Sequence, residues 1–182
     1  MPNQRVNIKQ LTVGFTLIEL MITLSVMAIV ATVGVPSFMS IIASNRVTAA
    51  SNGMVTALNL AKSDAIRSGQ NSVLCKSKDA ATCDAKLNWS DGWLLFNDTN
   101  GDQKKDTDER IIRSHAATDP SLSFIFRGGD FVEFRPNGST NESGRFCFRN
   151  TYKDNNSRVV RITHAGRIRT EAATGSNEDC KT

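Results

Sequence analysis

Residues 14–36 of this 182-residue chain read GFTLIELMITLSVMAIVATVGVP. From Phe15 to Val35 there are 21 residues, and the one ionisable side chain among them is Glu19. A helix needs about 20 consecutive apolar residues to cross a bilayer, where its backbone N–H and C=O groups must bond to each other. The rest of the chain is mostly polar, so the sequence predicts one membrane-spanning helix and one soluble domain.

The residues before this run do not have the order of a secretory signal peptide. Such a peptide carries its small-residue cleavage site after the apolar stretch, whereas Gly14 precedes it here. Arg5 and Lys9 give this end positive charge, which predicts that it stays in the cytoplasm. The soluble domain is therefore expected across the membrane, in the periplasm.

The segment Gly14-Phe15-Thr16-Leu17-Ile18-Glu19-Leu20 resembles the prepilin peptidase motif of type IV pilins and type II secretion pseudopilins. The resemblance implies that a prepilin peptidase cuts after Gly14 and methylates the amino group of Phe15. It also implies that Glu19 forms an ion pair with the amino terminus of a neighbouring pilin during assembly. Pro36 matches the helix-interrupting proline of the family and is expected to kink or locally melt the helix.

Glu19 is expected to have a partner, since a carboxylate inside an apolar span costs about 2.5–3.5 kcal/mol on insertion scales. The alternative is a carboxylate that stays protonated or reaches the membrane surface, because Glu19 lies close to the start of the span. The ion pair within the filament is the favoured interpretation.

A second periodic pattern follows Pro36. Apolar residues between Ile41 and Ile66 recur mostly at intervals of three and four residues, which is typical of one face of an amphipathic helix. We therefore expect the helix to continue from the membrane into the soluble domain, covering residues 15–68. Gly69 is placed to cap its C-terminus.

Short strand-like segments separated by glycine- and proline-containing turns fill the rest of the chain. We expect strands at Ser72–Lys76, Gly92–Phe96, Arg110–Ser114, Leu122–Arg127, Phe131–Arg135, Gly144–Phe148, Arg158–Thr163 and Arg167–Thr170.

The predicted fold class is α+β: a type IV pilin-like fold, in which a long N-terminal helix with a membrane-spanning first half packs on an antiparallel β-sheet domain. The expected division is a leader at 1–14, a transmembrane segment at 15–36 and a periplasmic domain at 37–182, helical over 37–68 and β-rich over 70–182.

Four further segments, in their order along the chain, resemble the GspH/FimT family of pilin-like proteins. They are Trp93–Asp98, Phe134–Gly138, Ile162-Thr163 and Gly166–Arg169. The family contains minor pilins of type IV pili and a minor pseudopilin of type II secretion, so the resemblance implies a subunit at or near the filament tip. The implied partners are the prepilin peptidase, other major and minor pilins and the inner membrane, which anchors the chain before it joins an extracellular pilus.

The four cysteines, Cys75, Cys83, Cys147 and Cys180, allow three sets of disulfide pairings. None of them forms a CxxC pair, and neither histidine lies at metal-ligand spacing from them, so no structural zinc site is expected. An exported chain is expected to form disulfides. We predict Cys75–Cys83, which closes a short polar loop, and Cys147–Cys180, which ties down the C-terminal tail.

The acidic segment Asp98–Glu109 has oxygen-bearing side chains at its first, third, fifth and twelfth positions, as an EF-hand loop has. However, Gly101 comes too early, Gln103 stands where the sharp turn needs glycine, and two lysines lie inside the loop. We therefore favour a solvated hairpin turn over a calcium site, and no metal is predicted.

Arginines dominate the C-terminal part of the domain. Between Ser143 and Arg169 a single acid, Asp154, stands against Arg145, Arg149, Lys153, Arg158, Arg161, Arg167 and Arg169. The net charge of the chain is only +4, so its charge is unevenly distributed. Exposed arginines form bidentate contacts with phosphates, and such binding weakens as the salt concentration rises.

Gly166-Arg167-Ile168-Arg169 ends this basic segment, in the second strand of a predicted hairpin. Strand alternation puts the two arginines on one face and Ile168 on the other, and Gly166 permits a tight turn. The segment resembles the GRxR element of FimT-type minor pilins, which is implicated in DNA binding during natural transformation. The resemblance implies that Gly166, Arg167 and Arg169 bind double-stranded DNA. Further contacts are predicted from Arg149, Arg158, Arg161 and His164. The alternative is that these arginines pair with acidic groups of a neighbouring pilin or are simply solvated.

The sequence contains no GxSxG, HExxH or P-loop motif, so we predict no enzyme and no cofactor. Two functional hypotheses remain. One is a minor pilin whose C-terminal basic hairpin binds double-stranded DNA without sequence preference. The other is a purely structural minor pilin or type II secretion pseudopilin that primes filament assembly.

Overall fold

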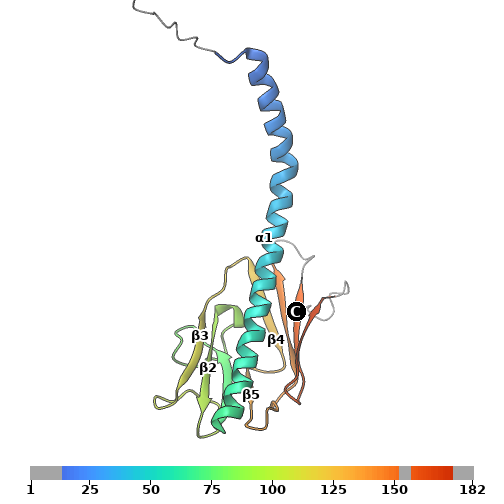
Figure 1. Cartoon of the computed structure of the whole chain (residues 1–182). Coiled ribbons are helices and arrows are strands. Elements are labelled where there is room, and N and C mark those ends of the chain that lie inside the picture. Colours follow the sequence, from blue (N-terminus) through green and yellow to red (C-terminus); the bar gives the residue numbers. More distant parts are fainter. Residues whose placement is uncertain (1–13, 152–156, 174–182) are drawn as a thin grey trace, which may run out of the picture. The chain divides into compact units, whose positions relative to one another are not determined.

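The structure is a computed structural model that describes residues 14–151 and 157–173. The chain divides into two compact units, Met1–Met39 and Ser40–Thr182 (Figure 1). Residues 1–13 of the predicted leader lie outside the described residues. Lys153, Asp154 and Cys180 also lie outside them.

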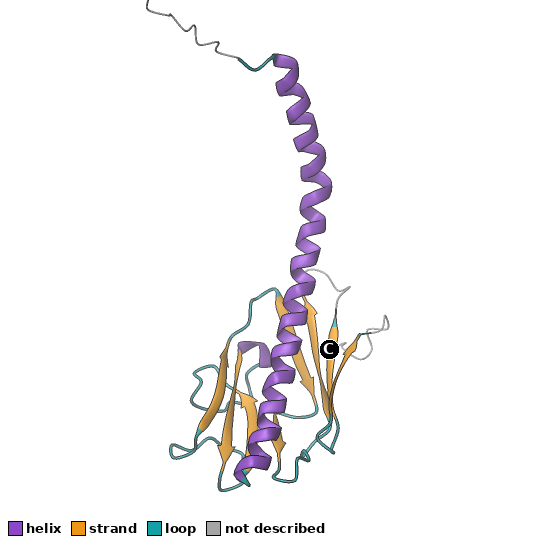
Figure 2. Ribbon diagram, in the orientation of Figure 1, coloured by secondary structure: helices purple, strands orange, loops and turns teal. Residues whose placement is uncertain are grey.

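The described part of the first unit is helical from Leu17 onward (Figure 2). It contains the start of α1, which covers Leu17–Ser68, close to the predicted range of 15–68. The hydroxyls of Thr23, Ser25 and Thr32 donate to carbonyls of the same helix at 2.8–2.9 Å, so they add no unsatisfied polar group to an apolar segment. This is the one described helix that is long and apolar enough to cross a membrane.

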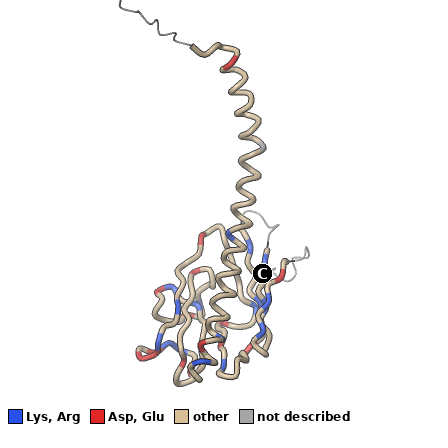
Figure 3. Tube along the Cα trace, in the orientation of Figure 1, with Lys and Arg blue, Asp and Glu red and all other residues tan. Residues whose placement is uncertain are grey.

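The apolar part of α1 is free of charge beyond its first turn. Between Glu19 and Arg46 there is no Lys, Arg, Asp or Glu, and the tube in Figure 3 is uncoloured over this stretch. α1 also continues through Pro36, so the expected local melting does not occur there. The reason is that proline removes one backbone donor while the bonds on both sides of it remain.

The second unit begins with the remainder of α1, which buries one narrow face. Buried residues recur at intervals of four and three along the helix, at Val47, Ser51, Met54, Leu58, Ala61 and Ala65, and Ala57 and Asp64 beside them are buried as well. Several are small, so neighbouring strands approach the helix closely. Gly69 ends the helix with φ of +70° and donates its N–H to the Ala65 carbonyl at 3.1 Å, which confirms the predicted cap.

The eight predicted strands are confirmed, each within two residues at either end, and they form two antiparallel sheets. Sheet A has the order β3-β2-β1-β5, with bounds Ile111–Ala116, Gly92–Asp98, Asn71–Lys76 and Phe131–Phe134. Sheet B has the order β4-β6-β7-β8, with bounds Leu122–Arg127, Gly144–Asn150, Arg158–Ile162 and Ile168–Ala172. A short 3-10 helix, η1 at Trp89–Asp91, precedes β2.

The main core lies between the second half of α1 and both sheets (Figure 1). Sheet A contributes side chains such as Leu95 and Phe134, and sheet B contributes Phe124, Phe146 and Ile162. The helix therefore packs on the antiparallel β-sheet domain, as predicted. This packing leaves one face of sheet B pointing away from the core.

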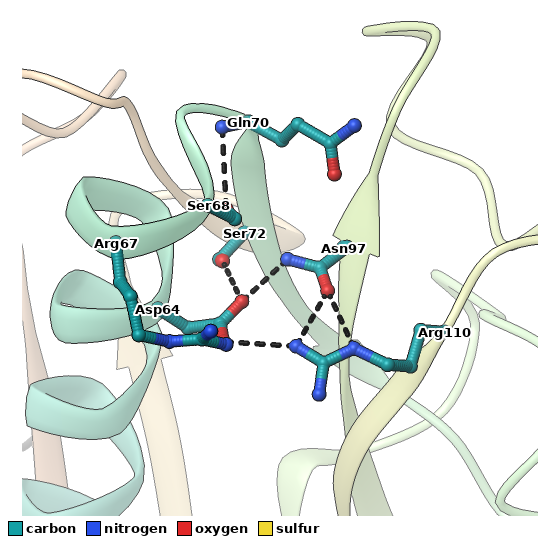
Figure 4. A network of polar contacts seen from close by, with 7 residues as sticks. All are labelled: Asp64, Arg67, Ser68, Gln70, Ser72, Asn97 and Arg110. Atoms are coloured by element: carbon teal, nitrogen blue, oxygen red, sulfur yellow. Dashed lines mark hydrogen bonds and ion pairs between the residues drawn. The ribbon is translucent and has the colours of Figure 1, made fainter.

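Asp64 on α1 is the centre of a polar network that joins the helix to sheet A (Figure 4). Its side chain is only 5% exposed. Oδ1 accepts hydrogen bonds from Arg67 at 2.7 Å and Arg110 at 2.9 Å, and Oδ2 accepts from Asn97 at 2.5 Å and Ser72 at 3.4 Å. Burial raises the pKa of Asp64, but the hydrogen bonds from Arg67, Asn97 and Arg110 outweigh burial and hold the pKa below its usual range. The charged carboxylate thus fixes the end of α1 on sheet A.

Candidate nucleic-acid interface

The predicted basic hairpin is formed by β7 and β8 of sheet B. Arg161 pairs in register with Arg169, and Ile162 pairs with Ile168. Side chains alternate between the two faces of a strand. Since Ile162 is buried in the core, Arg161 and Arg169 point to the outer face of sheet B. Arg167 directly precedes β8 and is exposed.

The turn of this hairpin is held by its own polar groups. Gly166 donates its N–H to the Thr163 carbonyl at 2.7 Å. The Arg167 carbonyl accepts the Thr163 N–H at 3.1 Å, and the Arg167 N–H donates to the Thr163 hydroxyl oxygen at 3.3 Å. Gly166 has φ of +68°, and a Cβ added there would overlap the carbonyl oxygen of Gly138. Gly166 is buried, so it shapes the turn and does not reach the surface itself.

Two neighbouring elements fix this turn from outside. Lys62 of α1 donates from Nζ to the Gly166 carbonyl at 2.9 Å. Thr140, between β5 and β6, donates its N–H to the His164 carbonyl at 2.9 Å, and its hydroxyl lies 2.6 Å from the Glu142 carbonyl and 3.1 Å from the Thr163 carbonyl. The arginines after the turn are therefore presented from an anchored segment.

The register of sheet B extends the hairpin pair into a row of four arginines, called the arginine row below. From β4 across β6 and β7 to β8, the directly paired residues are Arg127, Arg145, Arg161 and Arg169. Paired residues point to the same face of an antiparallel sheet. The row therefore crosses the whole outer face over about 14 Å, since neighbouring strands lie about 4.8 Å apart. Figure 3 shows several of the domain's Lys and Arg positions along these strands.

Acidic groups are scarce around the arginine row. Arg161 Nη2 lies 3.5 Å from Glu171 Oε2, and both side chains are about half-exposed. In residues 14–151 and 157–173, no carboxylate lies within ion-pair distance of Arg127, Arg167 or Arg169. These three arginines are exposed and retain their charge for an external anion.

A surface hollow of about 650 Å³ lies beside the arginine row, at its β4–β7 end. Arg127, Arg145 and Arg161 line it, together with backbone and side-chain groups of Ser143, Gly144 and Ile162–Ala165. Guanidinium groups and hydroxyls are the donors that bind phosphate oxygens. The hollow thus has the chemistry of an anion site.

The remaining predicted contacts lie apart from the arginine row. Arg149 faces outward like Arg145, but four residues further along β6, about 13 Å away at about 3.3 Å per residue. Arg158 pairs with Phe148, whose side chain is buried in the core. Arg158 therefore belongs to the opposite face of sheet B.

Sequence reasoning missed Arg127 and counted Arg145 only as part of the basic segment. Both stand inside correctly predicted strands, but no local signal says which residue of one strand pairs with which residue of the next. Alternation along each strand was available as a signal, since Arg127 and Arg145 both occupy outward positions next to core phenylalanines.

The N-terminal motif lies at the beginning of α1. Gly14 and Phe15 precede the helix, and the Phe15 side chain is 86% exposed. Thr16 Oγ1 accepts the Glu19 N–H at 3.3 Å, which places Glu19 in the first helical turn, where the helix dipole favours a negative charge.

The predicted disulfide Cys75–Cys83 is confirmed and links residues eight positions apart. Cys147 is buried on the outer side of sheet B, and no described cysteine is free. Because Cys180 lies outside the described residues, the Cys147–Cys180 pairing stays a prediction.

The acidic segment between β2 and β3 uses its carboxylates to hold its own backbone. Asp98 accepts N–H groups of Gly101 at 2.7 Å and Gln103 at 3.0 Å. Glu109 accepts those of Thr99 at 2.8 Å and Asp106 at 3.0 Å. Within the described part of the chain no three His, Cys, Asp or Glu residues are placed to share a metal ion.

Comparison with protein families gives two matches. Residues 50–166 match the family described as type II transport protein GspH. Residues 14–35 match the prokaryotic N-terminal methylation motif. No curated protein has a significant sequence match to the chain.

Solved structures share the fold at low sequence identity. The type IV minor pilin FimU of Pseudomonas aeruginosa superposes with a TM-score of 0.56 at 19% identity, covering 71% of this chain and 94% of FimU. The minor pseudopilin EpsH of the Vibrio cholerae type 2 secretion system gives a TM-score of 0.52 at 14% identity, covering 70% of this chain and 97% of EpsH. These similarities show a pilin-like fold.

Proposed function

Because this chain belongs to the GspH family, we propose that it is a minor type IV pilin that binds double-stranded DNA. In this proposal a prepilin peptidase cuts after Gly14 and methylates Phe15, and the first half of α1 anchors the chain in the inner membrane. Glu19 then pairs with the amino terminus of a neighbouring pilin as the chain enters the filament near its tip. The methylation motif and the apolar helix support these steps.

The observation that carries the DNA-binding proposal is the exposure of Arg167 and Arg169 on an anchored hairpin. In the described ranges neither guanidinium has a carboxylate partner. A subunit with only a structural role does not need two unpaired arginines on a turn that Lys62 and Thr140 hold in place. Arg161, opposite Arg169, adds a third positive charge.

Phosphate contacts of this kind position DNA without reading its sequence. Duplex DNA releases condensed counterions when arginines neutralise its phosphates, so log K falls with log salt at a slope of about −0.9 per phosphate. Binding is therefore expected to be sequence-independent and strongly salt-dependent. A retracting filament that carries such a subunit would bring DNA to the cell during natural transformation.

The test uses the fragment 40–182, which retains every described buried core residue, from Val47 to Ile162. We would measure its affinity for a labelled 20-base-pair duplex by fluorescence anisotropy over a series of salt concentrations. The Arg167→Gln/Arg169→Gln variant is expected to bind roughly 10- to 100-fold more weakly at 0.1 M salt, and its salt slope should be shallower by about 2.

A matched control removes two charges from the other side of the domain. Lys78 and Arg113 are exposed residues of the sheet A region, and the Lys78→Gln/Arg113→Gln variant has the same net charge as the hairpin variant. Its affinity should stay within about twofold of the wild type, apart from a small general electrostatic loss. Equal losses in both variants would contradict the assignment of the site.

A second candidate is a type II secretion pseudopilin that primes assembly without binding DNA. The family description, type II transport protein GspH, and the fold shared with EpsH favour it. If the wild-type fragment does not bind the duplex even at 50 mM salt, this structural role replaces the DNA-binding one.

A further inference from the structure

We propose that Lys62 of α1 is a positioning residue of the DNA-binding hairpin. Through its hydrogen bond to the Gly166 carbonyl, it fixes the direction in which Arg167 leaves the turn. This inference rests on the proposed function and deepens it, because it assigns part of the site to the helix. Lys62 and Gly166 are 104 residues apart in the sequence, so the GRxR resemblance does not include Lys62.

The peptide unit that joins Gly166 to Arg167 is bonded on both of its sides. Its carbonyl oxygen accepts a hydrogen bond from Lys62 Nζ at 2.9 Å, and its N–H donates to Thr163 Oγ1 at 3.3 Å. A peptide unit is planar, so two bonds at its opposite edges fix the orientation of the whole plane. The orientation of this plane determines where the Arg167 side chain begins.

The neighbouring peptide units of the turn are held in a different way. The Gly166 N–H and the Arg167 carbonyl both bond to backbone groups of Thr163, at 2.7 and 3.1 Å. The unit between them depends on two side chains instead, and it follows a glycine, the residue with the most backbone freedom. A bond from an ammonium group is charge-assisted and stronger than a neutral one. Lys62 is therefore the stronger of the two contacts that hold this unit.

The helix holds Lys62 in place for this contact. Lys62 lies two residues before Asp64, whose carboxylate fixes this end of α1 on sheet A. Its side chain also lies close to the turn between β5 and β6, since a Cβ added at Gly138 would be 3.1 Å from Lys62 Cε. The Gly138 carbonyl in turn lies against Gly166. The ammonium group thus reaches the hairpin from a fixed part of the domain.

The charge of Lys62 is not used in an ion pair within the described ranges of the chain. No carboxylate there lies within ion-pair distance of Lys62, which is partly buried. Lys76, by contrast, pairs with Asp130 at 2.8 Å. The contact of Lys62 with a backbone carbonyl of the hairpin indicates a role in shaping the turn.

A fixed turn lowers the entropic cost of binding. Affinity is lost when side chains and loops must become ordered at an interface, and preorganised groups avoid this loss. Arg167 is exposed directly after the bonded peptide unit. Removal of the Lys62 bond should therefore weaken duplex binding, while the number of arginine–phosphate contacts stays the same.

The experiment uses the full chain in nanodiscs of phosphatidylcholine, which has no net charge, and a labelled 20-base-pair duplex. Affinity and its salt slope are measured for the wild type, Lys62→Met, Lys62→Arg and Lys78→Met. Methionine has a helix propensity close to that of lysine and keeps an unbranched stem, but it removes the donor and the charge. The Lys78→Met control removes the same charge at an exposed position after β1.

Lys62→Met is expected to bind the duplex about three- to tenfold more weakly at 0.1 M salt, with a salt slope within about 0.3 of the wild-type value. Lys62→Arg keeps a charged donor and should bind within about threefold of the wild type. Lys78→Met should stay within about twofold. Combined with Arg167→Gln/Arg169→Gln, Lys62→Met should cause a further loss of less than about twofold, because the residues that it positions are absent. A merely structural role would lower the melting temperature without this dependence on the arginines.

A second variant decides the question if Lys62→Met does not fold. Thr163→Val removes the hydroxyl that accepts the Arg167 N–H and leaves the charge unchanged. It should weaken duplex binding about two- to threefold with an unchanged salt slope. Wild-type affinity in this variant would then overturn the inference.

The outcomes separate this inference from the proposed function. Unchanged binding by Lys62→Met, together with a loss in Arg167→Gln/Arg169→Gln, would overturn the inference and leave the proposed function in place. A salt slope shallower by about 0.9, with equal losses in the presence and absence of the two arginines, would mean that Lys62 contacts a phosphate itself and that positioning is wrong. Absence of duplex binding by the wild type would overturn the proposed function, and this inference with it.

Discussion

Sheet A and sheet B have the same number of strands and pack on the same helix, but they differ in how their charges are neutralised. Around sheet A, Asp64 accepts hydrogen bonds from Arg67 and Arg110, and Lys76 pairs with Asp130 at 2.8 Å. On the outer face of sheet B, Arg161 pairs with Glu171 at 3.5 Å, and Arg127, Arg167 and Arg169 are exposed to solvent. Charges that are neutralised within the domain stabilise it. Exposed arginines such as Arg127 and Arg169 on the outer face of sheet B are instead available to a partner.

The anchoring of the two regions also differs in kind. Sheet A is held by a disulfide at Cys75 and by the Asp64 network. The sheet B hairpin is held by steric fit of Gly166 and by bonds from Lys62 and Thr140 to its backbone. Changes around sheet A should therefore lower stability alone, and changes to the hairpin should alter DNA binding as well.

Gly166→Ala should have the largest effect. The new Cβ would overlap the Gly138 carbonyl, and alanine is strained at φ of +68°, so we expect the free energy of unfolding to fall by about 3 kcal/mol. DNA affinity should fall as well, because the turn must move. Urea unfolding and anisotropy measure the two effects. Full stability in this variant would show that the hairpin turn is not sterically fixed.

Removing the Cys75–Cys83 disulfide tests sheet A alone. The double variant Cys75→Ala/Cys83→Ala should lower the free energy of unfolding by about 2.5 kcal/mol, the loop-closure value for a loop of this length. DNA affinity at a temperature where the variant is folded should not change. A change in duplex affinity would show that sheet A also influences DNA binding.

Asp64→Asn tests the polar network through its pH dependence. The pKa of Asp64 lies below its unfolded value, so its contribution to stability is complete above about pH 4 and is lost as the pH falls through the lower folded value. We expect the variant to lose about 2 kcal/mol at pH 7 and to show a flatter decline in stability below pH 4. Parallel acid-unfolding curves for the two proteins would mean that Asp64 contributes no such pH dependence.

Glu171→Gln sharpens the description of sheet B. This substitution removes the carboxylate that lies 3.5 Å from Arg161, so Arg161 gains full charge toward solvent. Duplex affinity should rise by about threefold to fivefold at 0.1 M salt, while stability changes by less than about 0.5 kcal/mol because the pair is half-exposed. A weaker duplex affinity would argue that Glu171 positions Arg161 for binding.

Arg158→Gln should have the smallest effect. Arg158 was predicted as a DNA contact, but its register with Phe148 puts it on the opposite face from the arginine row. The affinity of the Arg158→Gln variant for the duplex should stay within about twofold of that of the wild type. A tenfold loss would mean that DNA also reaches the other face of sheet B.

Much of the fold was predictable from local signals. The recurrence of apolar residues at intervals of three and four on α1 predicted its buried face, and Gly69 predicted where the helix ends. The exceptions are Ile41 and Ile66, which fit the same periodic pattern but are more than half exposed. Periodicity assigns a residue to a face of the helix, whereas burial depends on where the sheets end.

The candidate site was predictable only in part, for a related reason. Arg167 and Arg169 were found because one hairpin and its turn lie in a single short segment. The arginine row depends on the pairing of β4 with β6 and of β6 with β7, which are separated by loops, and register between such strands is set by the packed core. Arg127 could therefore not be joined to Arg169 before the sheet was known.

The alternation within sheet B has a consequence for how its surface can evolve. A substitution at an outward position such as Arg127 or Arg169 changes the surface and leaves the opposite, core-facing positions untouched. A single inserted residue in β7 or β8 would instead turn arginines inward and Ile162 or Ile168 outward. Within a lineage of such domains, the basic face can be gained or lost by point substitution on an unchanged fold, whereas insertions are expected to be confined to the loops.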